Sequence, residues 1–182
     1  MAQKDYTWGI VLDLIKGDNH LRGMASHLST NHMMIARRIK DLIKENVVDF
    51  RMEGKNKVFF LKKTVEAKNY IFSSENYKLT QLLKKYPSLR GIVEKIQNEK
   101  RIKLALLFGS YAKGIAKEDS DIDIYIDTKD KKIKDGLSLL NSKLSVKIGK
   151  YNKSSLLIKE IEKNKVIIKG MELYYEKNNF FA

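Results

Sequence analysis

Apolar residues recur every three or four positions in three stretches of the first 64 residues, and this spacing predicts three helices. The stretches run over residues 8–15, 21–28 and 35–42. Two short segments, VVDFR and KVFFL, then flank a turn that contains Gly54, which predicts a β-hairpin. The expected order in this region is therefore helix, helix, helix, hairpin.

A helical connector is expected over residues 65–100. One helix is predicted from Val65 to Tyr86, with Ser73–Ser74 as a point where it could break, and Pro87 ends it. Ser88 can cap the helix that follows.

Beyond residue 101 the pattern alternates between strand and helix. Strands are predicted for IKLALLF, DIDIYID and LSVKIGKY, and helices for KIKDGLSLLNSKL and SSLLIKEIEKN. KVIIKGMELYYE is expected to close the sheet as a strand, or as a pair of strands interrupted at Gly170. This alternation predicts an α/β (α+β) domain at residues 101–182, in which helices flank a small mixed sheet.

Composition narrows the class of protein. The chain has 182 residues and a formal net charge of +14. It contains no cysteine, which excludes disulfides and thiolate metal sites. No apolar run approaches the roughly 20 residues that span a bilayer, and the N-terminus lacks a signal-peptide core. We therefore expect a cytoplasmic protein without a membrane partner. The charge favours nucleic acid or nucleotide phosphate as a partner, although Lys/Glu-rich surfaces also occur in proteins of heat-loving organisms.

The segment LLFGSYAKGIAKEDSDIDIYID, residues 106–127, carries the candidate chemistry. A buried strand runs into Gly109, which lets the backbone turn sharply and approach a ligand closely. Ser110 then opens a short helix whose free amides and hydroxyl can bind phosphate. Lys113, one turn further on, can add a positive charge to the same phosphates.

Asp121 and Asp123 share one face of the predicted strand DIDIYID, while three isoleucines take the other face. The isoleucines are expected in the core, so the two carboxylates lie side by side and repel each other unless a cation is bound. Magnesium prefers hard oxygen ligands and keeps positions open for water and substrate phosphates. The pair is therefore predicted to bind Mg²⁺ or Mn²⁺, which could activate an attacking hydroxyl and stabilise a pyrophosphate leaving group.

The spacing of Gly109–Ser110, ten residues and then Asp121-Ile-Asp123 resembles the DNA polymerase beta-like nucleotidyltransferases, specifically their minimal members. This resemblance covers about residues 102–176. It implies that Ser110 contacts a triphosphate, that the two aspartates hold the metals, and that a nucleoside monophosphate moves from an NTP, with ATP foremost, to an acceptor. Some minimal members are antitoxins that adenylylate a partner toxin. A protein hydroxyl is therefore one implied acceptor, beside a nucleic-acid end or a small molecule.

One feature departs from that family, whose active members often carry a third carboxylate on the next strand. Ser145 and Lys147 occupy the polar face of LSVKIGKY, where an aspartate is expected. Lys147 cannot ligate a metal as an ammonium group, but it can contact a nucleotide phosphate. Asp119 and Asp127 are alternative sources of a third carboxylate.

The pattern at residues 1–64 resembles a winged helix-turn-helix DNA-binding domain, with LSTNHMMIARRIKDLIKENVVDF as its recognition half. The resemblance implies that the third helix enters the major groove of double-stranded DNA by its N-terminal turns. The implied DNA contacts lie on this helix and near the hairpin: His32, Arg37, Arg38, Lys40, Arg51, Lys55 and Lys57. Such domains also serve as protein-binding or dimerisation modules.

Two functions fit these features. The first is a magnesium-dependent nucleotidyltransferase with an attached DNA-binding module, which Ser110, Asp121 and Asp123 favour. The second is a DNA-binding transcriptional regulator whose nucleotidyltransferase-like domain is inactive and senses nucleotide or holds a homodimer together. Ser145 and Lys147 favour this second hypothesis.

Overall fold

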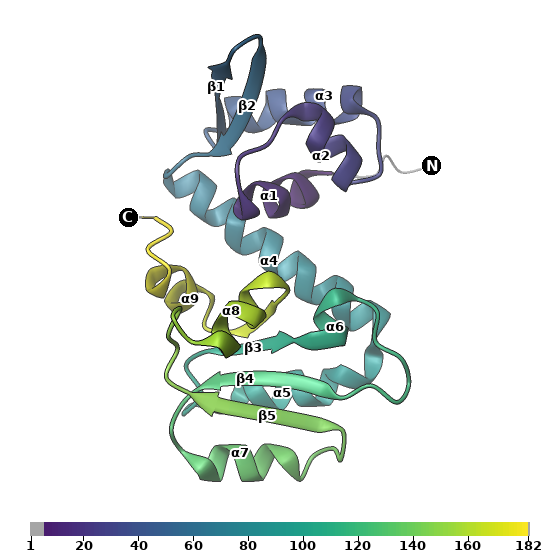
Figure 1. Cartoon of the computed structure of the whole chain (residues 1–182), viewed down its shortest axis with the longest axis vertical. Helices are drawn as coiled ribbons and strands as arrows, with labels where there is room; N and C mark the ends of the chain where they lie inside the picture. The colour runs from purple at the N-terminus through teal and green to yellow at the C-terminus, as the bar shows by residue number, and fades with distance from the viewer. Residues whose placement is uncertain (1–5, 182) are drawn as a thin grey trace. The chain divides into compact units, whose positions relative to one another are not determined.

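The computed structural model describes residues 6–181, which divide into two compact units. The first comprises residues 6–77 with Phe181, and the second comprises residues 78–180. The division falls within helix α4 (Val65–Lys85), which continues unbroken through Ser73 and Ser74 (Figure 1). The Ser74 hydroxyl is buried and donates to the Ile71 carbonyl at 2.7 Å, so it has a partner within the helix. No helix in the described part of the chain is long and apolar enough to cross a membrane.

The first unit has the predicted order of three helices and a hairpin (Figure 1). Its elements before α4 are α1 (Thr7–Lys16), α2 (Leu21–His27), α3 (His32–Lys44), β1 (Val48–Glu53) and β2 (Asn56–Leu61). The two strands pair antiparallel around a turn in which Gly54 has a φ of 61°. Side chains at helical spacing, among them Ile10, Leu14, Ile35 and Ile39, are buried in its core.

Two asparagines set the ends of α3. Asn31 accepts a hydrogen bond from the Met33 amide at 2.8 Å and so caps the N-terminus. Asn46 follows the C-terminus with a φ of 61°, the left-handed conformation that asparagine tolerates. Between these ends Ile35 and Ile39 face the core, so the opposite side of α3 is open to solvent.

The second unit is built on a four-stranded sheet with the order β5-β4-β3-β6. Its elements after α4 are η1 (Pro87–Leu89), α5 (Arg90–Asn98), β3 (Ala105–Phe108), α6 (Gly109–Lys113), β4 (Ile122–Asp127), α7 (Lys131–Ser138), β5 (Leu144–Gly149), α8 (Leu156–Lys163), β6 (Val166–Lys169) and α9 (Met171–Lys177). Strand β3 is antiparallel to β4 and β6, whereas β4 and β5 are parallel. The predicted small mixed sheet is therefore present.

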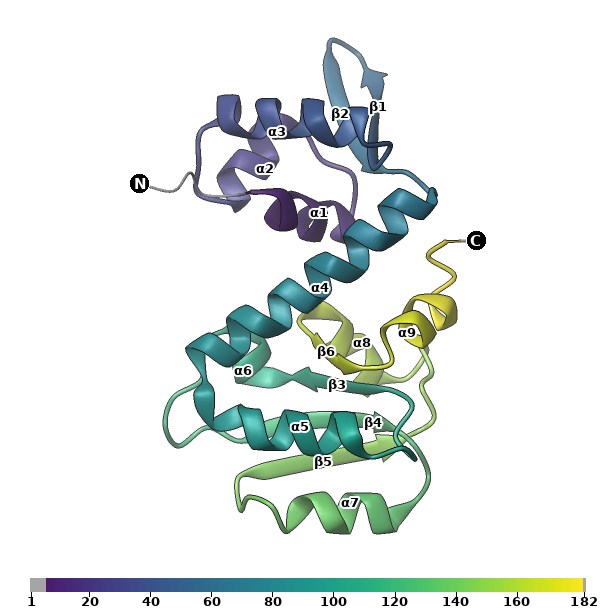
Figure 2. The same ribbon diagram turned by 180° about the vertical axis from the view of Figure 1, so that it is seen from behind.

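Helices cover both faces of this sheet (Figures 1 and 2). Ile122, Ile124 and Ile126 pack on one side in a core that includes residues of α5 and α7. The alternate residue Tyr125 points to the other side, where its ring stacks edge-on against Tyr151 at a centroid distance of 6.5 Å. Because Tyr125 is buried as well, β4 is covered on both faces beyond Asp123, and Asp121, just before the strand, is exposed.

The C-terminal segment differs from the prediction of a strand or a pair of strands. Only β6 is extended, and the chain then turns at Gly170, with a φ of 79°, into helix α9. A Cβ at Gly170 would overlap the Lys103 carbonyl oxygen, so glycine is required at this corner. Tyr174 and Tyr175 are both buried. Neighbouring side chains of a strand point to opposite faces, so a strand would not place both in one core. In helix α9 the two tyrosines, three and four residues after Met171, lie on the same side of the helix. Ser88 likewise lies inside η1 and makes no cap.

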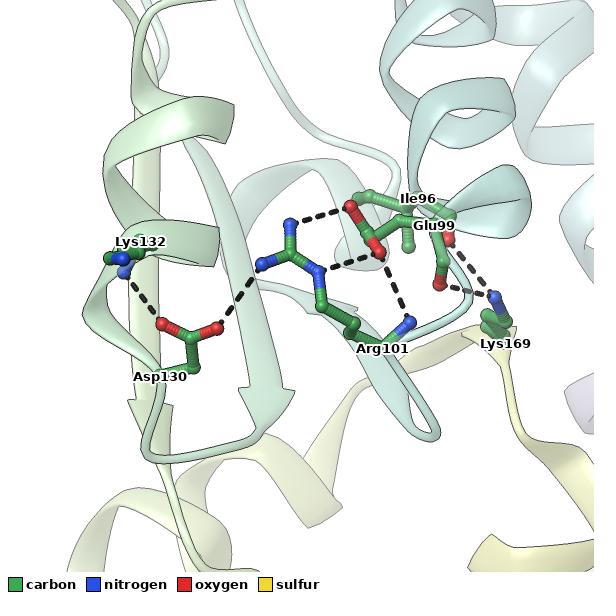
Figure 3. Close-up of polar contacts among 6 residues, drawn as sticks. All are labelled: Ile96, Glu99, Arg101, Asp130, Lys132 and Lys169. Atoms are coloured by element: carbon green, nitrogen blue, oxygen red, sulfur yellow. Dashed lines mark hydrogen bonds and ion pairs between the residues drawn. The ribbon is translucent and has the colours of Figure 1, made fainter.

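The loop between α5 and β3 is fixed by Arg101 (Figure 3). Its guanidinium pairs with Glu99 at 2.9 Å and with Asp130 at 3.3 Å. The hydrogen bonds from Arg101 lower the pKa of Glu99 to about 2. Asp130 in turn caps α7 by accepting from the Lys132 amide at 2.9 Å, so one arginine links the loop to the start of a helix.

Lys169, at the end of β6, binds the carbonyls at the C-terminal end of α5 (Figure 3). Its ammonium donates to the carbonyls of Gln97 at 2.7 Å and Glu99 at 2.8 Å, and more weakly to that of Ile96 at 3.4 Å. A cation at a helix C-terminus satisfies carbonyls that have no partner within the helix and complements the helix dipole. This contact ties an edge strand of the sheet to the helix beneath it.

Glu162 of α8 is the polar centre of the tyrosine cluster on the second face of the sheet. It accepts hydrogen bonds from Tyr174 at 2.6 Å and Tyr151 at 2.7 Å, and Lys165 pairs with it at 2.9 Å. Burial alone would raise the pKa of Glu162, but these hydrogen bonds and the charge of Lys165 outweigh burial and hold that pKa below its usual range. The ionised carboxylate therefore stabilises the fold.

We predict that Glu162→Gln lowers the free energy of unfolding by about 1–2 kcal/mol at neutral pH, since charged hydrogen bonds become neutral ones. A depressed pKa contributes stability above the usual glutamate range that is lost as pH falls through the depressed value. The difference between wild type and variant should therefore shrink in acid. Urea unfolding, followed by circular dichroism, measures this difference in the free energy of unfolding. The control is Glu160→Gln, which changes an exposed glutamate in the same helix. Equal losses in the two variants would contradict this account.

Candidate functional site

The site begins where β3 ends. Gly109, the first residue of α6, has a φ of 70°, and a Cβ there would overlap Oδ2 of Asp123 and lie 3.1 Å from its carboxyl carbon. The Asp123 carboxylate therefore lies directly against the backbone of the turn. Only glycine permits both this backbone conformation and this approach.

Asp121 and Asp123 are the two carboxylates at the start of β4, and the charge of Asp121 acts on Asp123. Asp123 sits in β4 opposite Phe108, and Asp121 immediately precedes that strand and is exposed. Burial raises the pKa of Asp123, and the negative charge of Asp121 raises it further. The two carboxylates are thus close enough to repel each other, which is the electrostatic condition that a bound cation relieves.

Strand β5 supplies two further side chains to the same face. Ser145 pairs with Asp123 in the β4–β5 register, and Lys147 pairs with Tyr125 two residues further on. The Ser145 hydroxyl and the positive charge of Lys147 both lower the pKa of Asp123. The role of Ser145 was missed in the sequence, where it marks only the position of an expected carboxylate. Its position opposite Asp123 depends on the register of two parallel strands.

Ser110 follows Gly109 in α6 and is half-buried, beside the turn that contacts Asp123. Lys113 ends the same five-residue helix and is exposed, and its charge acts on Glu160 of α8. Its contact with nucleotide phosphates therefore stays a prediction. The groups that the structure brings together at Asp123 are Gly109, Asp121, Ser145 and Lys147.

The alternative carboxylates do not complete the site. Asp127, at the far end of β4, pairs with Lys177 at 3.1 Å and accepts from the Tyr151 amide at 3.0 Å. Asp119 lies in the exposed turn before Asp121. Within residues 6–181, no three His, Cys, Asp or Glu side chains gather closely enough to hold a metal together. Two carboxylates are the acidic ligands that this site offers.

A separate concavity of about 540 Å³ lies in the first unit, between α2, the start of α3 and the hairpin. Its polar lining includes His20, Arg22, His32, Lys55 and Lys57. The last three are residues that the sequence predicts at a DNA interface. His20 and Arg22 were missed, because no spacing signal relates the start of α2 to a hairpin more than thirty residues later.

Backbone pairing holds the hairpin beside α2. The Asn19 amide donates to the Phe59 carbonyl at 3.1 Å, and the Phe59 amide donates back to Asn19 at 2.9 Å. The imidazole of His20 also contacts the Lys57 carbonyl at 3.1 Å. The hairpin and the N-terminal ends of α2 and α3 therefore form one continuous surface.

The predicted basic residues of this unit fall into two groups. Arg37, Lys40 and Lys55 are exposed, and none has a hydrogen-bond or ion-pair partner among residues 6–181. Arg38 donates to Thr7 and pairs with both Asp41 and Glu45 at 3.5 Å. Arg51 pairs with Asp18 and Glu53. The paired arginines have structural contacts within the unit, so the exposed group is better placed to meet phosphate.

Comparison with known proteins gives a match that lies within the second unit. Residues 90–174 match the family model described as "Polymerase beta, Nucleotidyltransferase", which spans α5 through most of α9 and includes both Gly109 and the aspartate pair. No match was found among curated proteins or among solved structures. The match supports a nucleotidyltransferase domain in this part of the chain.

We predict that Gly109→Ala costs about 1–3 kcal/mol of folding stability, because alanine disfavours this φ and its Cβ displaces the Asp123 carboxylate. The matched control is Gly136→Ala in α7, where a Cβ meets nothing within 4 Å and alanine favours the helix. Thermal unfolding of both variants should move in opposite directions. A Gly109→Ala protein as stable as wild type would show that the close approach is not required.

Proposed function

We propose that this protein is a metal-dependent nucleotidyltransferase that moves a nucleoside monophosphate, AMP from ATP in the first place, onto an acceptor hydroxyl. The observation that carries the proposal is the Asp123 carboxylate held against the Gly109 turn, with Asp121 beside it. The family match over residues 90–174 supports the reaction class. The acceptor is a hydroxyl group of a protein, a nucleic-acid end or a small molecule.

Each residue of the site has a separate role in this transfer. Asp121 and Asp123 would hold Mg²⁺ or Mn²⁺, which when bound supplies Lewis-acid stabilisation of the phosphates. The Gly109 turn lets a triphosphate approach the backbone, Ser110 offers its hydroxyl, and Lys147 offers an ammonium group. The acceptor oxygen forms a bond to the α-phosphorus, the bond from that phosphorus to the β-bridging oxygen breaks, and pyrophosphate leaves. The acceptor proton passes to a nearby carboxylate or to water.

We propose in addition that the first unit binds double-stranded DNA as a winged helix-turn-helix. The concavity between α2, α3 and the hairpin gathers His20, Arg22, His32, Lys55 and Lys57 on one surface. Arg37 and Lys40 add exposed positive charge on α3. Phosphate contacts of this kind fix a protein on the duplex without reading its sequence.

A regulator without catalytic activity is the second candidate function. The observation in its favour is that Lys147, rather than a carboxylate, extends from β5 on the aspartate face. In such a protein the second unit would bind nucleotide, or pair with another copy of the chain, and so alter DNA binding by the first.

Transfer of label from ATP distinguishes these functions. Incubation with Mg²⁺ and host extract should label an acceptor from ATP carrying the label on its α-phosphate, and not from ATP labelled on its γ-phosphate. Asp121→Ala combined with Asp123→Ala should reduce this transfer by roughly a hundredfold or more, because the electrostatic stabilisation of the phosphates is lost. Asp135→Ala, on the exposed side of α7, is the control. Tight ATP binding without any α-label transfer would favour the regulator.

DNA binding should depend on the exposed cations. Arg37→Ala combined with Lys55→Ala should weaken binding to duplex DNA and reduce the slope of log affinity against log salt by about 2, one for each lost phosphate contact. Lys16→Ala combined with Lys44→Ala removes the same charge from the ends of α1 and α3 and is the control. Fluorescence anisotropy at several salt concentrations measures the slope. Equal slopes for the two double variants would refute the proposed surface.

A further inference from the structure

Lys147 takes a position beside the aspartate pair that no local contact explains. Strand β5 runs parallel to β4, with Ser145 opposite Asp123 and Lys147 opposite Tyr125, so the lysine extends from the same face of the sheet. Lys147 is exposed, and its side chain has no hydrogen-bond or ion-pair partner in the part of the chain that the structure describes. Its ammonium is therefore free to interact with a ligand bound at the aspartates.

The acidic ligands of the site suit one divalent ion. Asp121 and Asp123 provide two carboxylates, and Asp127 is engaged by Lys177 and the Tyr151 amide at the far end of β4. A second ion beside the first would need a further hard oxygen ligand from the protein. The side chains on the same face of β5 are instead the neutral hydroxyl of Ser145 and the ammonium group of Lys147, and an ammonium group cannot coordinate a cation.

The charge of Lys147 disfavours the binding of a second divalent ion, as the lack of ligands does. A fixed ammonium group repels a second divalent ion placed near it, and it attracts the phosphates that such an ion would neutralise. Both effects make the lysine a substitute for a second metal.

We propose that the aspartate pair holds a single divalent ion, and that the Lys147 ammonium takes the place of a second one toward a bound triphosphate. This inference rests on the proposed nucleotidyltransferase function, since it concerns the same site. It predicts that replacing Lys147 with a carboxylate creates a second metal site, because Asp121, Asp123 and residue 147 would then present three carboxylates to one side of the sheet.

Equilibrium dialysis of the full chain against Mn²⁺ and α,β-methylene-ATP counts ions and nucleotides bound per chain without any turnover. Wild type should bind one Mn²⁺ with each nucleotide, and Lys147→Asp should bind two. Lys150→Asp, which makes the same charge change at an exposed residue just after β5, should still bind one. Lys147→Gln should also bind one ion, several-fold more tightly, because the repelling charge is gone. Circular dichroism verifies that each variant is folded.

The outcomes separate this inference from the proposed function. Two Mn²⁺ ions in wild type, together with α-label transfer, would overturn the role of Lys147 and leave the nucleotidyltransferase standing. A single ion in folded Lys147→Asp would also overturn it. Nucleotide binding without any Mn²⁺ in wild type would refute both the single-ion site and the metal-dependent transferase.

Discussion

The site depends on one close approach, the packing of the Asp123 carboxylate against the backbone at Gly109. A carboxylate partly removed from water loses hydration, and here it also meets the charge of Asp121, so its pKa rises. The fold nevertheless holds it in place, because β4 lies between β3 and β5 and its isoleucines are buried on the opposite face. A buried strand thus carries an acidic group whose electrostatic environment favours a bound cation.

The sequence predicts the elements well where their pattern is local. The alternation in DIDIYID fixes both a buried face and an acidic face of β4, and the structure confirms that the three isoleucines are buried. Helix α3 is equally well specified, since Asn31 caps it, Asn46 ends it, and Ile35 and Ile39 mark its buried side. In both cases a short-range period sets the buried face, and in α3 an asparagine also marks each end of the element.

The sequence is less informative where the outcome depends on contacts between distant segments. MELYYEK reads as an extended segment because of its aromatic residues, yet it forms α9, since Gly170 must turn tightly against Lys103 and both Tyr174 and Tyr175 find buried positions. Arg38 and Arg51 look like free cations in the sequence, and only the fold reveals their acidic partners. Arg22 carries no signal until the hairpin packs beside α2.

Lys147 has a competing structural explanation, because β5 is an edge of the described sheet and lysines on edge strands discourage pairing with other chains. Lys143 and Lys150 flank the same strand and are exposed, so the edge already carries positive charge at both ends. Edge protection requires charge along the strand, but it does not require that charge on the face shared with Asp123. A role in ligand binding explains why Lys147 lies on that face, two residues after Ser145, and edge protection does not.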